Sequence, residues 1–529
     1  MGKNDKSAQN GSLILVLVAM VLGVLMGVML TSHNGGSEPS HSLQGKMGEV
    51  MQLVESEYVD AVDLDSLSEH LVAVMLGELD PHSTYQSARE TEHTEEMMRG
   101  NFEGVGIVLH REGDTTFVGQ VLAGGPSDGV GLLPGDMILA VDGVDVRGMK
   151  SDSVVARLRG NRGTRVKVAV ERCGRRLEFG IRRGVVGHTT LSYSTMLDDT
   201  TGYIILSTFA ETSHDEFRAA LRKLKRQGMR RLIFDLRGNG GGSLSSAIGI
   251  ANELLPSGSL IVYTQGQHQR RQNVYARPGG MFTEGSVVVM VDESSASASE
   301  VVSGALQDND RALIVGRRTF GKGLVQREFH LDDGSSVLLT TARYYTPSGR
   351  SIQRPYDQGT DEYYRDYVQQ VLDESYADSP TVHVTDSTPY YTVGGRVVYG
   401  GGGIFPDKLM PYRKDRNYAY YNQLASKGLF NKVAFEYVRQ NAEKLLSQYA
   451  DAADFVKRFH ADDALLHRLV DDGQATGIDP DKHSLQALHR LMTDMIKANI
   501  GYFLFGNDAY FGVSNREDDD LKQVMEMKI

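Results

Sequence analysis

Residues 230–255 decide the fold of this chain: RRLIFDLRGNGGGSLSSAIGIANELL. An apolar run of strand length leads through a cluster of glycines into a segment with apolar residues at helical spacing. Neighbouring segments repeat this pattern, with strands indicated at GYIILSTF (202–209), SVVVMVD (286–292) and RALIVG (311–316), and helices at HDEFRAALRKLKRQG (214–228) and SEVVSGALQD (299–308). Such alternation predicts a mainly parallel sheet with crossover helices, so residues 185–414 are expected to form an α/β domain.

Two of the predicted strands end in unusual sequences, DLRGNGGGS (235–243) and DESSASASE (292–300). In open parallel sheets, functional sites form just beyond the carboxyl ends of strands. In the second sequence, small residues can hold a hydroxyl group at a crowded point, and the next helix offers free N–H groups to an oxyanion. Ser297 and Glu300 also fit a helix capping box, so this segment alone leaves both interpretations open.

A lysine follows the serine-rich segment at 292–300. The sequence GRRTFGKGLVQREF (316–329) places Lys322 between two glycines, after a short strand. A lysine can act as a general base only where burial lowers its pKa from about 10.4 toward neutrality. The alternative, a solvated surface lysine, is the common case for a single Lys.

Residues 101–184 change to short alternating runs separated by glycine turns, which predicts a small β domain. The sequence GPSDGVGLLPGDMILAVDG (125–143) resembles the core of PDZ domains, and FEGVGIVL (102–109) would then be the loop and strand that accept a peptide. In that fold a partner's C-terminus adds as an extra strand, and loop amides hold its carboxylate. The residues expected in this role are Gly104, Val105, Gly106 and Ile107. A generic β-barrel with glycine turns is the alternative.

The N-terminus contains eighteen consecutive uncharged residues at 13–30, LILVLVAMVLGVLMGVML. That length reaches the ~17–25 residues of a membrane-spanning helix. Lys3 and Lys6 precede the run, so the positive-inside rule places the rest of the chain across the membrane. Residues 1–31 are therefore expected to be a single-pass inner-membrane anchor, with the catalytic part in the periplasm. The alternative is a cleaved signal peptide and a soluble periplasmic form.

The remaining segments are predicted to be helical. Residues 43–100 carry apolar residues at helical spacing, as do residues 415–529. The apolar stripes of the C-terminal extension are predicted to be faces for packing or for self-association into a homo-oligomer.

Composition excludes several function classes. The 529 residues carry a formal net charge of −12, which argues against a nucleic-acid partner. Cys173 is the single cysteine, so intrachain disulfides and cysteine-based zinc sites are excluded. No motif calls for a metal or a cofactor, and neither is predicted.

Taken together, the motifs resemble the C-terminal processing (tail-specific) serine proteases, a family with a PDZ domain and a Ser–Lys catalytic dyad. The matching sequences include LDPHSTY (79–85), DLRGNGGG (235–242), SSASASE (294–300), TFGKGLVQ (319–326) and YYTPSGRSIQ (344–353). The resemblance implies a multidomain α/β protein: membrane helix, helical segment, PDZ domain, crotonase/ClpP-like protease core and C-terminal helical extension.

The resemblance also assigns roles to individual residues. It implies that Ser297 is the nucleophile, that Lys322 is the base and that Gln326 orients the lysine. The oxyanion would be held by the amide of Ala298 and by a glycine of the DLRGNGGG turn. That glycine is taken as Gly241, although three consecutive glycines leave the choice open.

The function implied is endopeptidase cleavage of proteins that present an accessible apolar C-terminal tail. Ser297 would attack the scissile carbonyl while neutral Lys322 accepts its proton. The alternative from another class is a membrane-tethered PDZ scaffold with an inactive protease core.

Overall fold

The computed structural model describes residues 43–187, 189–375, 386–412 and 417–528. The chain divides into two compact units, one ending at Met75 and the other beginning at Leu76. The first unit contains α2 (Leu43–Glu57) and most of α3 (Leu64–Gly77). Within the described ranges, no helix combines the length and the apolar character needed to cross a bilayer. The predicted anchor at 13–30 lies outside the described residues.

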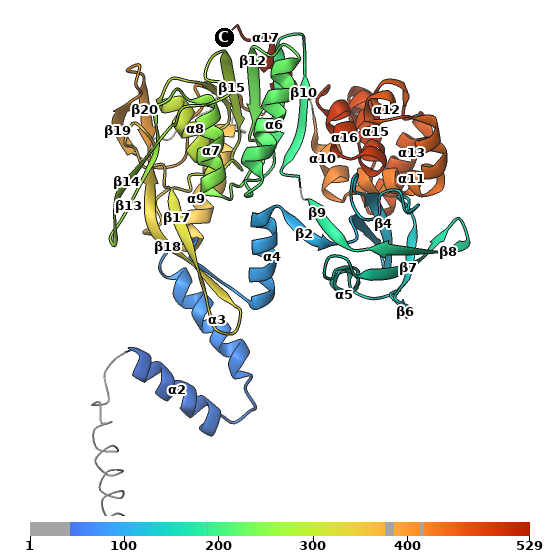
Figure 1. Cartoon of the computed structure of the whole chain (residues 1–529), viewed down its shortest axis with the longest axis horizontal. Helices are drawn as coiled ribbons and strands as arrows, with labels where there is room; N and C mark the ends of the chain where they lie inside the picture. Colours follow the sequence, from blue (N-terminus) through green and yellow to red (C-terminus); the bar gives the residue numbers. More distant parts are fainter. Residues whose placement is uncertain (1–42, 188, 376–385, 413–416, 529) are drawn as a thin grey trace, which may run out of the picture. The chain divides into compact units, whose positions relative to one another are not determined.

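The predicted parallel sheet is present in the second unit. Its strand order is β10-β11-β12-β15-β16-β21, and every neighbouring pair is parallel except β10 with β11. The strands are β10 (Leu191–Met196), β11 (Thr201–Leu206), β12 (Arg231–Asp235), β15 (Ser286–Val291), β16 (Leu313–Gly316) and β21 (Lys408–Leu409). The crossover helices are α6 (Ser213–Arg226), α7 (Leu244–Leu254) and α8 (Ala298–Asp308). These helices lie side by side over one face of the sheet (Figure 1).

Alternate residues of the same strands enter two different cores, because successive side chains of a strand point to opposite faces. On β12, Leu232 and Phe234 pack with the crossover helices, whereas Ile233 belongs to the cluster on the other face. That second face is covered by the C-terminal helix α17 (Asp519–Glu526), whose Leu521 and Val524 are buried there.

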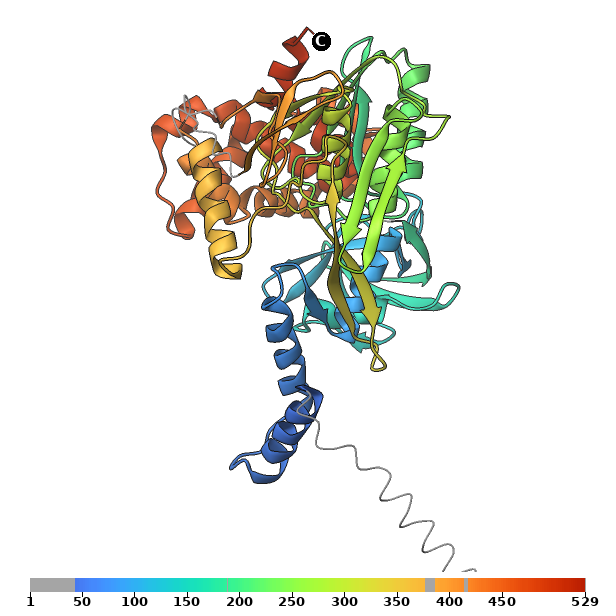
Figure 2. The same ribbon diagram turned by 90° about the vertical axis from the view of Figure 1, so that its left-hand side faces the viewer.

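A second, antiparallel sheet extends from the core. Its path is β1-β18-β13-β14, and β17 pairs with the other edge of β18. The strands are β1 (Thr84–Gln86), β13 (Leu260–Gly266), β14 (Gln269–Tyr275), β17 (Leu324–His330) and β18 (Ser336–Tyr345). β17 and β18 form a long hairpin (Figure 2). The core is completed by α9 (Thr360–Ser375) and the hairpin of β19 (Asp386–Tyr391) with β20 (Val397–Gly400).

The predicted β domain is also confirmed. Its sheet has the order β3-β4-β5-β7-β8, and β6 pairs with β5. The domain also contains the helix α5 (Ser151–Leu158). The strands are β3 (Ile107–Glu112), β4 (Thr115–Val121), β5 (Met137–Val141), β6 (Val144–Asp145), β7 (Arg165–Arg172) and β8 (Arg175–Arg182). The chain enters and leaves this domain through the antiparallel pair β2 (Asn101–Gly104) and β9 (Gly184–Gly187), and α4 (Ala88–Arg99) precedes it.

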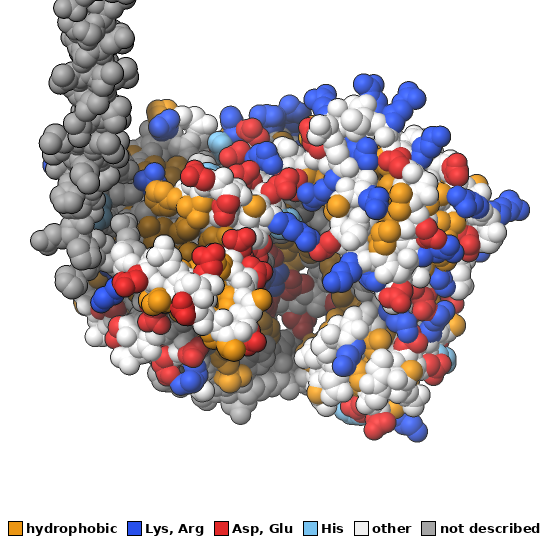
Figure 3. Space-filling view, turned by 90° about the horizontal axis from the view of Figure 1, so that it is seen from below, with side chains coloured by type: hydrophobic (Ala, Val, Ile, Leu, Met, Phe, Trp, Pro, Cys, Tyr) orange, Lys and Arg blue, Asp and Glu red, His pale blue; other side chains and the backbone are white. Residues whose placement is uncertain are grey.

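The C-terminal extension is helical, as predicted, and forms a bundle with its own core (orange to red in Figure 1). Its helices are α10 (Ala419–Ser426), α11 (Leu429–Gln448), α12 (Ala452–Arg458), α13 (Asp463–Ala475), α14 (Lys482–Ala487), α15 (His489–Phe505) and α16 (Asn507–Ser514), followed by α17. On the face drawn in Figure 3, acidic and basic side chains are interspersed and form no continuous basic stripe.

Candidate active site

The two unusual strand ends lie side by side, because β12 and β15 are adjacent parallel strands. The turn after β12 and the loop after β15 are joined by hydrogen bonds. The Ser295 hydroxyl donates to the carbonyl oxygen of Leu236 at 2.8 Å, and the Ala296 amide donates to the carbonyl oxygen of Asn239 at 3.0 Å. The glycine turn and the serine loop therefore form one rigid edge of the sheet.

Ser297 stands at the N-terminus of α8 in a rare backbone conformation. Its φ is 54° and its ψ is −110°, a region that non-glycine residues seldom adopt. Such strain costs on the order of 1–3 kcal/mol and clusters at functional sites. Gly241 lies against it: a Cβ at Gly241 would come within 2.8 Å of the Ser297 Cβ, so only glycine fits there.

Glu300 connects the serine loop to the lysine loop. Its fully buried carboxylate accepts four hydrogen bonds of 2.6–2.9 Å. The donors are the amides of Ser297, Gly321 and Lys322 and the hydroxyl of Thr319. Burial raises the pKa of Glu300 to about 7, although all four hydrogen bonds oppose that shift. The capping-box interpretation of Glu300 is confirmed in part, and the same carboxylate also fixes the lysine loop.

Lys322 is half-buried and lines the same cavity as Ser297. Burial lowers the pKa of the Lys322 ammonium from its usual 10.5, whereas the carboxylates of Asp80 and Glu300 oppose that shift. The backbone at Lys322 is held on both sides: its amide donates to Glu300, and its carbonyl accepts a 2.8 Å hydrogen bond from the Tyr344 hydroxyl. The same hydroxyl lies 3.2 Å from the carbonyl oxygen of Ser297.

The predicted catalytic and oxyanion residues line one cavity of about 730 Å³. They are Ser297, Lys322, Gln326, Gly241 and Ala298. The fold thus brings these five residues together from three segments of the chain: the turn after β12, the loop after β15 with the start of α8, and the lysine loop with β17.

The backbone amides near Ser297 differ in whether they already donate a hydrogen bond. The Gly241 amide donates to the Asn239 side-chain oxygen at 2.9 Å. In the described part of the chain, the amides of Ala298, Gly240 and Gly242 have no acceptor. Ala298 therefore has the free N–H group that an oxyanion needs. The Gly241 amide is engaged with Asn239, so its role as the second donor stays a prediction.

Gln326 lies on β17, and its side-chain amide contacts Thr340 of β18. Its Nε2 donates to the Thr340 hydroxyl at 3.1 Å, and that hydroxyl donates to Asp80 at 3.1 Å. No hydrogen bond from Gln326 to Lys322 is present among the described residues. Its role in orienting the lysine stays a prediction.

Two residues of the site, Asp80 and His82, received no role in the sequence analysis. Both lie in the LDPHSTY sequence, far from Lys322 along the chain. His82 lines the cavity, and its Nε2 is 3.1 Å from the Tyr363 hydroxyl. Burial and the nearby Lys322 charge lower the pKa of His82 to about 4, so it is neutral at pH 7. The signal that could have found them is the DPH sequence just before a short strand.

The predicted peptide loop of the β domain has the expected form. Val105 and Gly106 join β2 to β3 and are buried, yet their amides have no acceptor within the described residues. Gly106 has a φ of 73°, and a Cβ there would come within 2.8 Å of Pro126. β3 is an edge strand, so one side of its backbone is unpaired within this sheet and can accept an extended peptide.

Comparison with known proteins agrees with this arrangement of a peptidase core and a PDZ domain. The model of peptidase family S41 matches residues 200–361, the PDZ domain model matches residues 95–171, and a family of unknown function (DUF8443) matches residues 420–506.

Two relatives match over most of their own length. The chain is 30% identical over 347 residues to the carboxy-terminal processing protease CtpA of Bacillus subtilis, covering 64% of this chain and 74% of that protein. It is 33% identical over 337 residues to the carboxy-terminal-processing protease of Bartonella bacilliformis, covering 62% of this chain and 76% of that protein. Among solved structures, the photosystem II D1 C-terminal processing protease matches with a TM-score of 0.33 and 28% identity, covering 57% of this chain and 83% of that one. The chain belongs to the carboxy-terminal processing proteases, a family of serine peptidases with a PDZ domain.

Proposed function

We propose that the chain is a membrane-anchored, periplasm-facing serine endopeptidase. It captures the C-terminal tails of protein substrates with its PDZ domain and cleaves them by a Ser297–Lys322 acyl-enzyme mechanism. The observation that carries this proposal is the joint position of Ser297 and the half-buried Lys322, whose pKa is lowered, in one cavity beside the free amide of Ala298.

The chemistry follows from the properties of these groups. Neutral Lys322 accepts the hydroxyl proton as the Ser297 Oγ attacks the scissile carbonyl carbon. The developing oxyanion accepts hydrogen bonds from the Ala298 amide and from an amide of the glycine turn. The Lys322 ammonium then protonates the leaving amine. Once neutral again, it takes a proton from the water that hydrolyses the acyl-enzyme.

Substitution of the lysine tests the mechanism. With a peptide that ends in a free apolar C-terminus, we expect wild type to cleave and Ser297→Ala, Lys322→Ala and Lys322→Arg to be inactive. Arginine keeps the positive charge but cannot be a neutral base, since its pKa exceeds about 12. Turnover by Lys322→Arg would refute the general-base role. An inactive wild type that still binds the peptide would favour the PDZ scaffold instead.

The membrane part of the proposal rests on the apolar run at 13–30. We expect the full chain to stay with membranes after an alkaline carbonate wash, and a C-terminal alkaline phosphatase fusion to be active. A soluble product that lacks residues 1–31 would support the cleaved signal peptide. An inactive fusion would refute the orientation.

A further inference from the structure

The end of the chain returns to the edge of the sheet that carries the proposed catalytic groups. α17 lies on the sheet face opposite the crossover helices, where Leu521 and Val524 are buried. The Arg231 side chain donates to the carbonyl oxygen of Val524 at 2.6 Å. α17 is thus fixed to β12, the strand that leads into the glycine turn.

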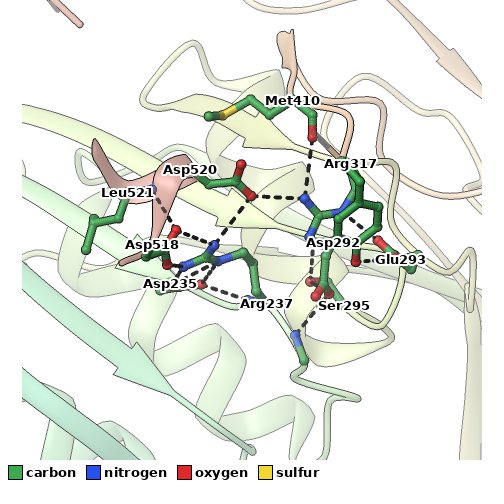
Figure 4. Close-up of polar contacts among 12 residues, drawn as sticks. Asp235, Arg237, Asp292, Glu293, Ser295, Arg317, Met410, Asp518, Asp520 and Leu521 are labelled. Atoms are coloured by element: carbon green, nitrogen blue, oxygen red, sulfur yellow. Dashed lines mark hydrogen bonds and ion pairs between the residues drawn. The ribbon is translucent and has the colours of Figure 1, made fainter. Parts of the chain in front are cut away.

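Arg237, in the turn after β12, lies between two carboxylates (Figure 4). One is Asp235, the last residue of β12, which accepts from Nη2 at 2.7 Å. The other is Asp518, which accepts from Nη2 at 2.6 Å and from Nη1 at 3.3 Å. Two-atom contacts between guanidinium and carboxylate fix orientation as well as distance.

Arg317, after β16, makes a similar pair of contacts (Figure 4). Its side chain is only 5% exposed. Its Nε donates to Glu293 at 2.8 Å, and its Nη1 donates to Asp520 at 3.0 Å. The Asp520 carboxylate also lies 3.5 Å from Nη1 of Arg237, so it joins the two arginines.

The segments that these two arginines contact contain the proposed oxyanion donor and the proposed nucleophile. Arg237 opens the turn that contains Gly241, and Glu293 opens the loop that contains Ser297. Between them, the Gly238 amide donates to the Asp292 carboxylate at 2.9 Å. A shift of either arginine would therefore be transmitted to the oxyanion turn and to the nucleophile.

We propose that Asp518 and Asp520 are positioning residues for the proposed active site: the C-terminal helix supplies the two carboxylates that hold Arg237 and Arg317, and thereby the glycine turn and the serine loop. The inference rests on the proposed function. Neither aspartate touches substrate, so both act through the arginines.

The expected effect is on the chemical step. A misplacement of about 1 Å at a catalytic group costs on the order of a hundredfold in rate, so we expect the double variant D518N/D520N to lose about tenfold to a hundredfold in kcat. Because tail capture is assigned to the PDZ domain, KM should change less than about twofold. The single variants D520N and D520E complete the set: D520E, which keeps the carboxylate on a longer side chain, should lose less kcat than D520N.

Asparagine is chosen because it keeps the cap of α17. The Asp518 Oδ1 accepts from the Leu521 amide at 2.9 Å, and Asn serves equally well at such a position. The matched control is E526Q, which removes an exposed carboxylate from the same helix.

The measurements are kcat and KM of the full chain on a tailed peptide, together with the thermal midpoint of each variant. A selective loss of kcat in D518N/D520N at temperatures well below its midpoint, with normal E526Q, supports the proposal. Wild-type kcat in D518N/D520N would overturn it, as would a loss that D520E and D520N share equally. An inactive wild type would instead refute the proposed function.

Discussion

The hydroxyl groups of Ser295, Ser297 and Ser299 differ in what they contact. Those of Ser295 and Ser299 are buried and donate at 2.8 Å to the carbonyl oxygens of Leu236 and Asn239. Ser297 lines the cavity instead. The outer two serines are therefore structural, and the middle one is free for chemistry.

We therefore expect Ser297→Ala to abolish cleavage without loss of stability. Ser295→Ala and Ser299→Ala should cleave but unfold more easily, since each loses a buried hydrogen bond whose net contribution is about 0.5–1.5 kcal/mol. Peptide cleavage and urea unfolding measure the two effects. Activity in Ser297→Ala together with inactive Ser295→Ala would show that the nucleophile is assigned to the wrong serine.

The environment of Lys322 predicts how activity responds to pH. Burial lowers the pKa of Lys322, and the nearby Asp80 carboxylate raises it because a negative charge favours the ammonium form. Activity should increase with pH as Lys322 loses its proton. Asp80→Asn removes the negative charge and should lower the Lys322 pKa further, so the rising limb should move to lower pH, by on the order of half a unit to one unit.

This substitution keeps the hydrogen bonds at Oδ1 but removes the one at Oδ2, which accepts from the Ser83 hydroxyl at 2.6 Å. The Asp80 Oδ1 accepts from the amides of His82 and Ser83 at 2.8 and 2.9 Å, and an asparagine oxygen can accept the same two hydrogen bonds. The pH dependence of kcat/KM is the measurement, with the exposed Asp479→Asn as control. A limb that moves to higher pH, or stays in place, would contradict the role of Lys322 as base.

At the scale of single elements, the loop between β2 and β3 can be tested without removing its domain. A side chain at Gly106 would contact Pro126 at 2.8 Å and would force an L-residue into a φ of 73°. Gly106→Ala should therefore distort the unpaired amides of the loop and weaken binding of peptides with a free C-terminal carboxylate. Cleavage of an unfolded substrate at high concentration should persist if the domain only tethers substrate.

The matched control for this loop is Gly113→Ala. Gly113 also has a positive φ, 55°, but a Cβ there meets nothing within 4 Å. Isothermal titration with free-acid and amidated forms of one peptide separates the effects. If wild type binds both forms equally, or if the two alanine variants bind alike, the loop does not recognise the carboxylate.

The sequence predicted the elements whose identity depends on local pattern. Apolar runs and glycine turns predicted the parallel sheet, and a long specific motif predicted the PDZ domain. It could not assign α17 to the second face of the sheet, because two apolar residues, Leu521 and Val524, do not specify what they pack against. The hydrogen bond from Gly241 to Asn239 was likewise beyond prediction, since a run of glycines fixes no single backbone conformation.

At the scale of the second unit, the helical extension contacts the PDZ domain as well as the core. The centre of the His110 ring on β3 lies 3.9 Å from the centre of the Phe435 ring on α11. The centre of the Phe117 ring on β4 lies 5.4 Å from the same Phe435 centre. A turn of the same domain comes so close to α11 that a Cβ at Gly135 would be 2.6 Å from the Arg439 Cα. Deleting residues 102–184 would therefore expose part of the extension's core, and Gly106→Ala is the cleaner test of PDZ function.

This contact predicts that the two parts stabilise each other. Phe435 is fully buried between the extension and the PDZ sheet. We expect Phe435→Ala to cost about 3–5 kcal/mol of unfolding free energy, because it removes apolar contacts and leaves a cavity. Hydrogen exchange should also become faster in β3 and β4, although neither strand is changed. Phe329→Ala, at a 40% exposed side chain, is the control and should cost much less. If the loss in Phe435→Ala is confined to α11 and exchange in β3 and β4 is unchanged, the extension does not support the PDZ domain.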